Sequence, residues 1–260
     1  MTQSIESVPP GPRTSLGPPS KLLLWSEWRS TLEFGMAVAT SPALLTAPRG
    51  DGHPVWVLPG FLTSDRSTLV LRTYLSALGY QSHAWEMGRN LGGVVAMRER
   101  LRRRLSEISS STGRTVSIVG WSLGGLYARD LAAAMPELLR YVITLGSPFR
   151  DMGASNANAL YESLSGERFS DMPHIDRNAL GGDLHVPTTA VHSKTDGVVN
   201  WRSCVLDENS RAENVEVYGS HLGLGVNPSV LWLVANRLAQ AERTFRPFDP
   251  VGPFMLAYPR

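Results

Sequence analysis

Short apolar runs alternate with amphipathic segments along most of this 260-residue chain. From residue 54 onward, runs rich in Val, Ile and Leu are typical of buried strands, and the stretches between them repeat apolar residues every three to four positions, as one helix face does. A strand–helix–strand order requires parallel pairing, with helices on both faces of the sheet. The pattern therefore predicts an α/β, doubly wound fold with a mostly parallel sheet of about six strands. The predicted strands are 55–58, 80–85, 115–119, 141–145, 186–191 and 214–218, and the predicted helices are 65–78, 97–108, 123–139 and 228–240.

The segment before the first predicted strand has a different pattern. Residues 21–40 place Leu24, Trp28, Leu32 and Met36 at fourfold spacing, with polar residues off that stripe, which predicts an amphipathic helix. The polar face carries both signs of charge without a basic excess. Packing of the stripe on the core is therefore favoured over binding to a membrane surface.

A long connection interrupts the alternation between the fourth and fifth predicted strands. This connection, residues 150–183, is too long for an ordinary loop and contains a weak helical signal near Leu160. We therefore predict a small helical lid insertion over one end of the sheet. We assign residues 21–249 to one domain that includes this lid. A Pro- and Ser-rich leader at 1–20, expected to be disordered, precedes the domain, and a C-terminal tail at 250–260 follows it.

The bulk composition refines this picture. With 42% hydrophobic residues the chain can bury a sizeable core, and a net charge of +2 gives no reason to expect a nucleic-acid or membrane partner. A single cysteine, Cys204, excludes an intramolecular disulfide. No run reaches the roughly 18 apolar residues of a membrane span, and the leader lacks the apolar stretch of a signal peptide. We therefore expect a cytoplasmic protein and, since no His and carboxylate cluster has metal-ligand spacing, no metal or cofactor.

The sharpest local signal is TVSIVGWSLGGLY at residues 115–127, where a β-branched strand meets a helix at a serine between glycines. The Gly-x-Ser-x-Gly pattern alone is weak evidence. Here the strand before it and the helix after it would place Ser122 on a sharp turn with its hydroxyl pushed out of the sheet. The flanking glycines let strand and helix approach closely. Ser122 is therefore the candidate nucleophile.

A serine hydroxyl needs a base to take its proton, and the base needs an anion that holds it in the right tautomer. Of six histidines, His221 stands in the glycine-rich loop GSHLGLG directly after the last predicted strand. Asp196 follows the fifth predicted strand and precedes a glycine. Both side chains are thus expected at the carboxyl ends of the strands, where open α/β sheets place their sites. A purely structural role for either residue is the alternative.

Acyl transfer also requires donors for the oxyanion that develops as a carbonyl is attacked. The N–H of Leu123 is free at the start of a predicted helix, and the loop LPGFL after the first strand offers the N–H of Phe61, with that of Leu62 as an alternative. The candidate substrate contacts are Leu62, Trp121, Leu160, Tyr161 and Leu164, and the insertion also offers Phe169 and Met172.

The succession of PGF, GWSLGG, TLGSPF, SKTDGVV and GSHLGLG resembles the α/β-hydrolase superfamily, and in particular its bacterial lipases and esterases. The resemblance spans all six predicted strands. It implies a Ser-Asp-His triad in this chain order at Ser122, Asp196 and His221, and an oxyanion hole at Phe61 and Leu123. The first antiparallel strands that are usual in that superfamily have no counterpart in this chain.

These residues predict a serine hydrolase that cleaves carboxylic esters through an acyl-enzyme intermediate, with a small acyl ester as its substrate. The same triad also fits an acyltransferase, a thioesterase, an amidase or a carbon–carbon bond hydrolase. A non-catalytic scaffold that binds a partner through the Trp-rich N-terminal helix is the alternative from another class. Because the insertion mixes charged with apolar residues, the pattern favours an esterase over a lipase with an apolar interfacial lid.

Overall fold

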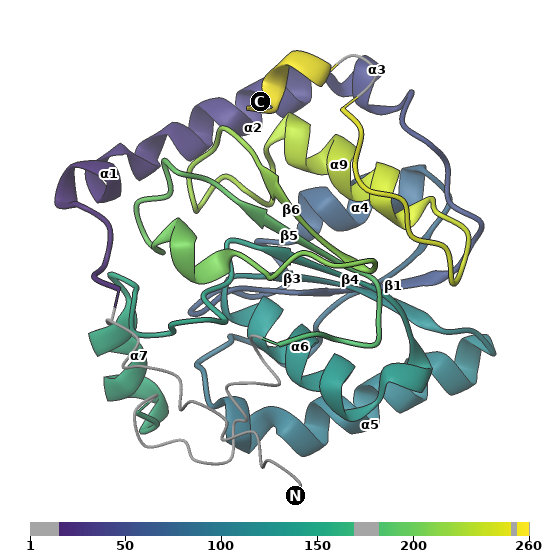
Figure 1. Ribbon diagram of the computed structural model, residues 1–260, viewed down its shortest axis with the longest axis horizontal. Coiled ribbons are helices and arrows are strands. Elements are labelled where there is room, and N and C mark those ends of the chain that lie inside the picture. The colour runs from purple at the N-terminus through teal and green to yellow at the C-terminus, as the bar shows by residue number, and fades with distance from the viewer. Residues whose placement is uncertain (1–15, 169–181, 251–253, 260) are drawn as a thin grey trace, which may run out of the picture.

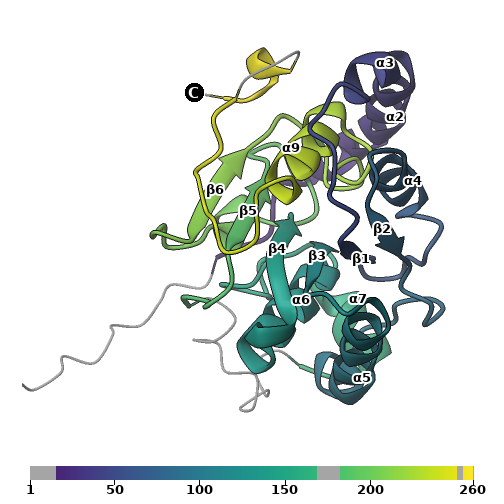
Figure 2. The same cartoon turned by 90° about the vertical axis from the view of Figure 1, so that its right-hand side faces the viewer.

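The protein folds around one parallel sheet of six strands (Figures 1 and 2). This computed structural model describes residues 16–168, 182–250 and 254–259. The strand order is β2-β1-β3-β4-β5-β6, and every neighbouring pair is parallel. The predicted fold class is therefore confirmed. The strands are β1 (Pro54–Leu58), β2 (Gln81–His83), β3 (Val116–Trp121), β4 (Leu139–Leu145), β5 (Thr188–His192) and β6 (Ala212–Glu216).

Burial along each strand follows its place in the sheet. Every residue of β1, β3, β4 and β5 is buried, because helices cover both faces of the sheet centre. The edge strand β6 alternates between buried and half-buried positions, and the other edge strand, β2, is three polar residues long. Short or polar edges of this kind discourage pairing with another chain.

Four helices form the two outer layers: α4 (Leu69–Ala77), α5 (Val94–Thr112), α6 (Leu123–Ala134) and α9 (Pro228–Leu238). α5 and α6 bury one apolar cluster against the sheet, and α4 and α9 bury a second cluster on the opposite face (Figure 2). In α5, Leu101, Leu105 and Ile108 are buried at the predicted spacing. Hydrophobic periodicity therefore locates these layers correctly.

Two helices, α4 and α6, are shorter than predicted by four residues or more, for local reasons. α4 begins at Leu69 and not at residue 65, because the Asp65 carboxylate instead accepts the N–H groups of Trp85 and Glu86 at 2.7 and 3.0 Å. α6 ends at Ala134, before Pro136, whose ring disfavours helical geometry in the preceding residue.

The N-terminal helical segment differs most from its prediction. Its stripe faces outward, with Trp28 66% and Met36 56% exposed, whereas Glu27 and Glu33 are only 4% and 7% exposed. The prediction that the stripe packs on the core is wrong, because the segment lies on loops whose backbone N–H groups need acceptors. The segment is also broken into α1 (Lys21–Trp25), the 3-10 turn η1 (Ser26–Arg29), α2 (Ser30–Ala39) and α3 (Ser41–Leu44).

Both ends of the described chain dock on the domain. The N–H of Leu16, which we assigned to the leader, donates to Asp151 Oδ2 at 2.8 Å. Residues 1–15 lie outside the described residues. In the tail, the buried hydroxyl of Tyr258 donates to a carbonyl of α9 at 2.7 Å.

The insertion between β4 and β5 contains α7 (Asn158–Ser165), where the helical signal lay. The hydroxyl of Tyr161 donates to Glu167 Oε2 at 3.0 Å, and the same carboxylate accepts the N–H groups of Val94 and Val95 at 2.8 and 3.2 Å. The insertion is thus tied to the first turn of α5. Residues 169–181 lie outside the described residues.

Candidate active site

β3 and α6 meet at Ser122 in a sharp turn. Ser122 has φ 53° and ψ −117°, a strained conformation for a residue with a side chain. Its N–H donates to the carbonyl of Leu145 in β4 at 2.8 Å. A Cβ at Gly124 would lie 2.4 Å from the Leu58 carbonyl oxygen in β1, so only glycine lets α6 approach the sheet this closely. The turn presents the Ser122 hydroxyl at the carboxyl ends of the strands.

Asp196 and His221 meet across two loops, one after β5 and one after β6. His221 Nδ1 lies 2.6 Å from Asp196 Oδ2, and both residues are buried. The other carboxylate oxygen accepts the N–H groups of Val198 and Val199 at 2.8 and 2.7 Å. Because an ionised carboxylate only accepts, we assign the proton to Nδ1, which leaves Nε2 as the acceptor.

The charges around His221 set its titration. Burial alone would lower the pKa of this imidazole. The negative charge and hydrogen bond of Asp196, together with the charge of Glu27, outweigh burial and raise the pKa of His221 above its ordinary value. The imidazole is therefore a stronger base than a histidine in water.

Trp121 joins the serine turn to the histidine loop. Its indole Nε1 donates to the His221 carbonyl at 3.1 Å, so the residue before Ser122 touches the loop that carries the imidazole. The hydroxyl of Ser122 itself makes no hydrogen bond to His221 in the described structure. Hydrogen bonds of this kind often tighten only when substrate binds.

Two of the three candidate oxyanion donors are free. No described residue accepts the N–H of Phe61 or Leu123. The N–H of Leu62 donates to the Asn90 carbonyl at 2.7 Å, so the Leu62 alternative is wrong. A Cβ at Gly60 would lie 3.3 Å from Ser122 Cβ, which places the Phe61 loop beside the serine.

Sequence reasoning missed Asn90, which holds that loop in place. Its side-chain amide donates to the Pro59 carbonyl at 2.9 Å, and its Oδ1 accepts the hydroxyl of Tyr127 at 3.0 Å. Together with the bond from Leu62, these contacts fix the turn that presents the Phe61 N–H. No motif around Asn90 signals this role in the sequence.

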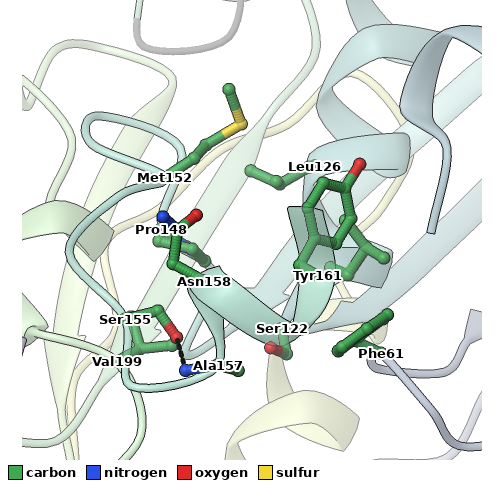
Figure 3. A pocket seen from close by; sticks show the side chains of 11 residues that line it. Phe61, Ser122, Leu126, Pro148, Met152, Ser155, Ala157, Asn158, Tyr161 and Val199 are labelled. Carbon is green, nitrogen blue, oxygen red and sulfur yellow. Dashed lines mark hydrogen bonds between the residues drawn. The ribbon is translucent and has the colours of Figure 1, made fainter. Parts of the chain in front are cut away.

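A narrow apolar pocket opens beside Ser122 (Figure 3). The cavity measures about 40 Å³, and the rings of Phe61 and Tyr161 pack edge to face against each other in its wall, with centroids 5.4 Å apart. Leu126 and Met152 extend the apolar wall. Such a lining suits a small hydrocarbon group next to the hydroxyl.

Of the five candidate substrate contacts, Tyr161 lines this pocket and the other four do not. Leu160 and Leu164 share the outer face of α7 and are 48% and 50% exposed. Trp121 is buried under the histidine loop, and Leu62 does not line the pocket. Apolar character alone did not reveal which face of α7 turns inward. Two further candidates, Phe169 and Met172, lie outside the described residues.

A second Ser–His–Asp arrangement lies at the opposite end of the sheet. His53 Nδ1 is 2.6 Å from Asp51 Oδ1, and its Nε2 is 3.0 Å from the hydroxyl of Ser117. Ser117 is fully buried inside β3. Asp51 is shared with Arg114 and Arg140 at 2.9 and 2.8 Å. Burial, with those arginines, lowers the pKa of His53 to about 4.

Neither a metal-ligand cluster nor a membrane-spanning helix is present in residues 16–168, 182–250 and 254–259. No three His, Cys, Asp or Glu side chains there converge as metal ligands would. In the same ranges, no helix combines the length and the apolar character needed to cross a bilayer.

Comparison with known sequences gives partial matches. No family model matches the chain. Over 135 residues it is 29% identical to a triacylglycerol lipase from Burkholderia plantarii, covering 45% of this chain and 36% of the relative. Over 91 residues it is 33% identical to a triacylglycerol lipase from Pseudarthrobacter phenanthrenivorans, covering 34% of this chain and 26% of the relative. The matched part of the chain thus spans well under half the length of these curated relatives.

Comparison with solved structures matches most of the chain. Aspergillus fumigatus lipase B aligns with a TM-score of 0.58 and 19% identity over 76% of this chain and 55% of that one. Naproxen esterase from Bacillus subtilis aligns at 0.51 and 14% identity, over 81% and 98%. An alpha/beta superfamily hydrolase from Oenococcus oeni PSU-1 aligns at 0.53 and 14% identity, over 71% and 91%. Together with the parallel sheet and the sharp turn at Ser122, these matches show that the chain has the α/β-hydrolase fold.

Proposed function

We propose that this protein is a serine hydrolase that cleaves carboxylic esters through an acyl-enzyme intermediate. The observation that carries the proposal is the buried 2.6 Å contact between Asp196 and His221, next to a strained Ser122 flanked by two free N–H groups. The partial matches to triacylglycerol lipases support an ester as the bond that is cleaved.

In the first half of the proposed reaction, Ser122 Oγ attacks the acyl carbon while His221 Nε2 takes the hydroxyl proton. Asp196 holds the imidazole in the required tautomer and stabilises the imidazolium. The oxyanion of the tetrahedral intermediate accepts the N–H groups of Phe61 and Leu123, the latter at the positive end of α6. His221 then gives its proton to the departing alcohol.

In the second half, His221 takes a proton from water, and the resulting hydroxide attacks the acyl-enzyme carbonyl. The same two N–H groups receive the second oxyanion. The bond to Ser122 breaks, the serine oxygen regains the proton from the imidazolium, and the carboxylic acid leaves. No cofactor or external redox partner is needed for this cycle.

We infer that the acyl group occupies the apolar pocket beside Ser122 that Phe61 and Tyr161 line. A cavity of about 40 Å³ with apolar walls favours a short acyl chain. The described part of the predicted lid insertion, residues 150–168, contributes Tyr161 to this pocket, and side-chain contacts of Tyr161 and Glu167 tie α7 to the start of α5. A longer acyl chain would require α7 to move.

Covalent labelling with a fluorophosphonate, followed by peptide mapping, tests the nucleophile. We expect one adduct on Ser122 in the folded protein and none in Ser122→Ala. Absence of an adduct in the folded wild-type protein would favour the non-catalytic scaffold instead.

A series of nitrophenyl esters from acetate to palmitate tests the substrate class, with water and added alcohol compared as acyl acceptors. We expect the highest kcat/KM for short acyl chains and release of free acid. Preferential transfer to the alcohol would identify an acyltransferase, and a preference for thioester or amide substrates would reassign the leaving group.

A further inference from the structure

The 3-10 turn η1 touches both loops of the proposed triad, and Figure 1 shows α1 and α2 passing the loops that follow β5 and β6. In this turn, Glu27 is only 4% exposed. Its Oε1 accepts the N–H of Gly197 at 2.8 Å and that of His221 at 3.0 Å, and its Oε2 accepts the N–H of Leu222 at 2.8 Å. One carboxylate thus connects the residue after Asp196 to His221 itself.

Arg29, at the end of the same turn, connects the same loops with the opposite charge. Its guanidinium donates to the carbonyl of Thr195, the residue before Asp196, and to the Gly219 carbonyl at 3.2 Å. Glu27 therefore accepts from one side of Asp196 while Arg29 donates to the other. The side chains of this one 3-10 turn therefore provide hydrogen-bond partners for backbone N–H and C=O groups in both loops.

The backbone of α1 packs directly on the acid loop. A Cβ at Gly197 would lie 2.3 Å from the carbonyl oxygen of Leu23, a contact that no side chain could tolerate. The glycine that follows Asp196 is therefore explained by the N-terminal segment that covers it.

Other contacts between the two loops lie farther from the imidazole. The hydroxyls of Ser193 and Thr195 both donate to the Gly219 carbonyl, at 2.7 and 3.1 Å, two residues before His221. Glu33 accepts the N–H of Ser220 at 2.7 Å but reaches only the histidine loop. Among the described residues, Glu27 alone bonds to both the acid loop and the backbone of His221.

We propose that Glu27 is a positioning residue for the reaction: it locks the Asp196 loop to the His221 loop, so that the two side chains keep their contact while the imidazole gains and loses a proton. The inference rests on the proposed hydrolase function. Burying a carboxylate is costly unless each oxygen is hydrogen-bonded, and here both are. The charge of Glu27 also acts on the imidazole whose loop it holds.

Four charged groups face His221 or its loop from the elements packed around it: Asp196 after β5, Glu27 and Arg29 on η1, and Glu33 on α2. Burial lowers the pKa of His221, and Asp196 followed by Glu27 raises it. Removing the charge of Glu27 should therefore lower the pKa of the imidazole. A residue that merely stabilised the fold would leave that pKa unchanged.

The test is Glu27→Gln in the full-length protein, with Trp28→Ala as the matched control from the outer face of the same turn, where Trp28 is 66% exposed. For Glu27→Gln we expect kcat on a short nitrophenyl ester to fall about tenfold to a hundredfold. We expect KM to stay constant and the acid limb of the pH profile of kcat/KM to move to lower pH. The control should keep the wild-type kcat and pH profile.

Arg29→Met is the second variant, because this side chain is partly exposed and its loss is better tolerated by the fold. We expect kcat to fall by a smaller factor, without movement of the acid limb to lower pH. If Glu27→Gln does not fold, a folded Arg29→Met with reduced kcat supports the proposal, and one with wild-type kcat overturns it.

A folded Glu27→Gln with wild-type kcat, or with reduced kcat and an unshifted acid limb, also overturns the proposal. Failure of the parent hypothesis looks different, since the wild-type protein would then form no fluorophosphonate adduct. Labelling of wild type and variant in parallel therefore separates the two failures.

Discussion

Each end of the central sheet carries an aspartate–histidine pair with a serine nearby. At the amino end His53 Nε2 lies 3.0 Å from the hydroxyl of Ser117, whereas at the carboxyl end His221 makes no hydrogen bond to Ser122 in the described structure. At the carboxyl end, Ser122 lies on a pocket. At the amino end, Ser117 is sealed inside β3. The aspartate–histidine distance is 2.6 Å in both sets. This distance therefore does not distinguish the two sets.

The electrostatic surroundings do distinguish them. Asp196 accepts hydrogen bonds from backbone N–H groups, which do not neutralise its charge. That charge raises the pKa of His221. Asp51 is shared with two arginines, and burial lowers the pKa of His53 to about 4. A neutral, weakly basic His53 can hydrogen-bond but is a poor proton acceptor. We therefore expect the two sets to perform different roles with the same residue types.

Removing each serine should separate the two sets most clearly. Ser122→Ala should lower kcat on the order of a millionfold, because the nucleophile and the base act as one unit. Ser117→Ala should leave kcat unchanged. Ester hydrolysis and thermal unfolding of both variants provide the check, and equal activity in wild type and Ser122→Ala would refute the assignment.

Removing each aspartate charge should give the next largest difference. Asp196→Asn should lower kcat about ten-thousandfold, since an amide favours the wrong imidazole tautomer. Asp51→Asn should affect unfolding and spare kcat of the folded fraction. Steady-state kinetics normalised by fluorophosphonate titration separates these effects, and a matching loss of kcat in both variants would contradict the comparison.

The pH profile of activity should report His221. A protonated imidazole cannot take the serine proton, so kcat/KM should fall as pH drops through the pKa of His221 in the free enzyme. Because that pKa is raised from 6.5, we expect the midpoint of the acid limb above 6.5. A midpoint at or below 6.5 would speak against the role given to Asp196 and Glu27.

The pH dependence of stability should report His53. Its folded-state pKa of about 4 lies below the unfolded value of 6.5, so the unfolded chain binds the proton first as pH falls. Stability should therefore be lost between pH 6.5 and 4, by an amount on the order of 3 kcal/mol. Urea unfolding at several pH values measures this loss, and His53→Gln should reduce it. An identical pH dependence in the variant would exclude His53 as its source.

Sequence patterns predicted best those helices and strands whose burial depends on the hydrophobicity of their own side chains. The apolar face of α5 and the Val- and Ile-rich runs of β3 and β4 pack as expected. The turn at Ser122 was equally predictable, since strand, glycines and helix are contiguous.

Predictions failed where distant backbone groups decided the outcome. In the N-terminal segment Trp28 faces outward and Glu27 faces inward, which is the reverse of what we expected. The reason is that loops more than 160 positions away in the sequence place their backbone N–H groups against this segment. The N–H of Leu62 was unavailable because Asn90 accepts it. α7 turns Tyr161 inward and Leu160 outward, although the side chain of Leu160 is the more apolar of the two.

The amino-acid sequence thus specified the order of strands and helices and the turn at the serine. The hydrophobicity of side chains and the conformational freedom of glycine are both evident from residues that are neighbours in the chain. The meeting of Asp196 with His221 and the burial of Glu27 beneath both were decided only by the tertiary structure. Which backbone groups require a partner becomes known only when the loops that carry them are brought together in space.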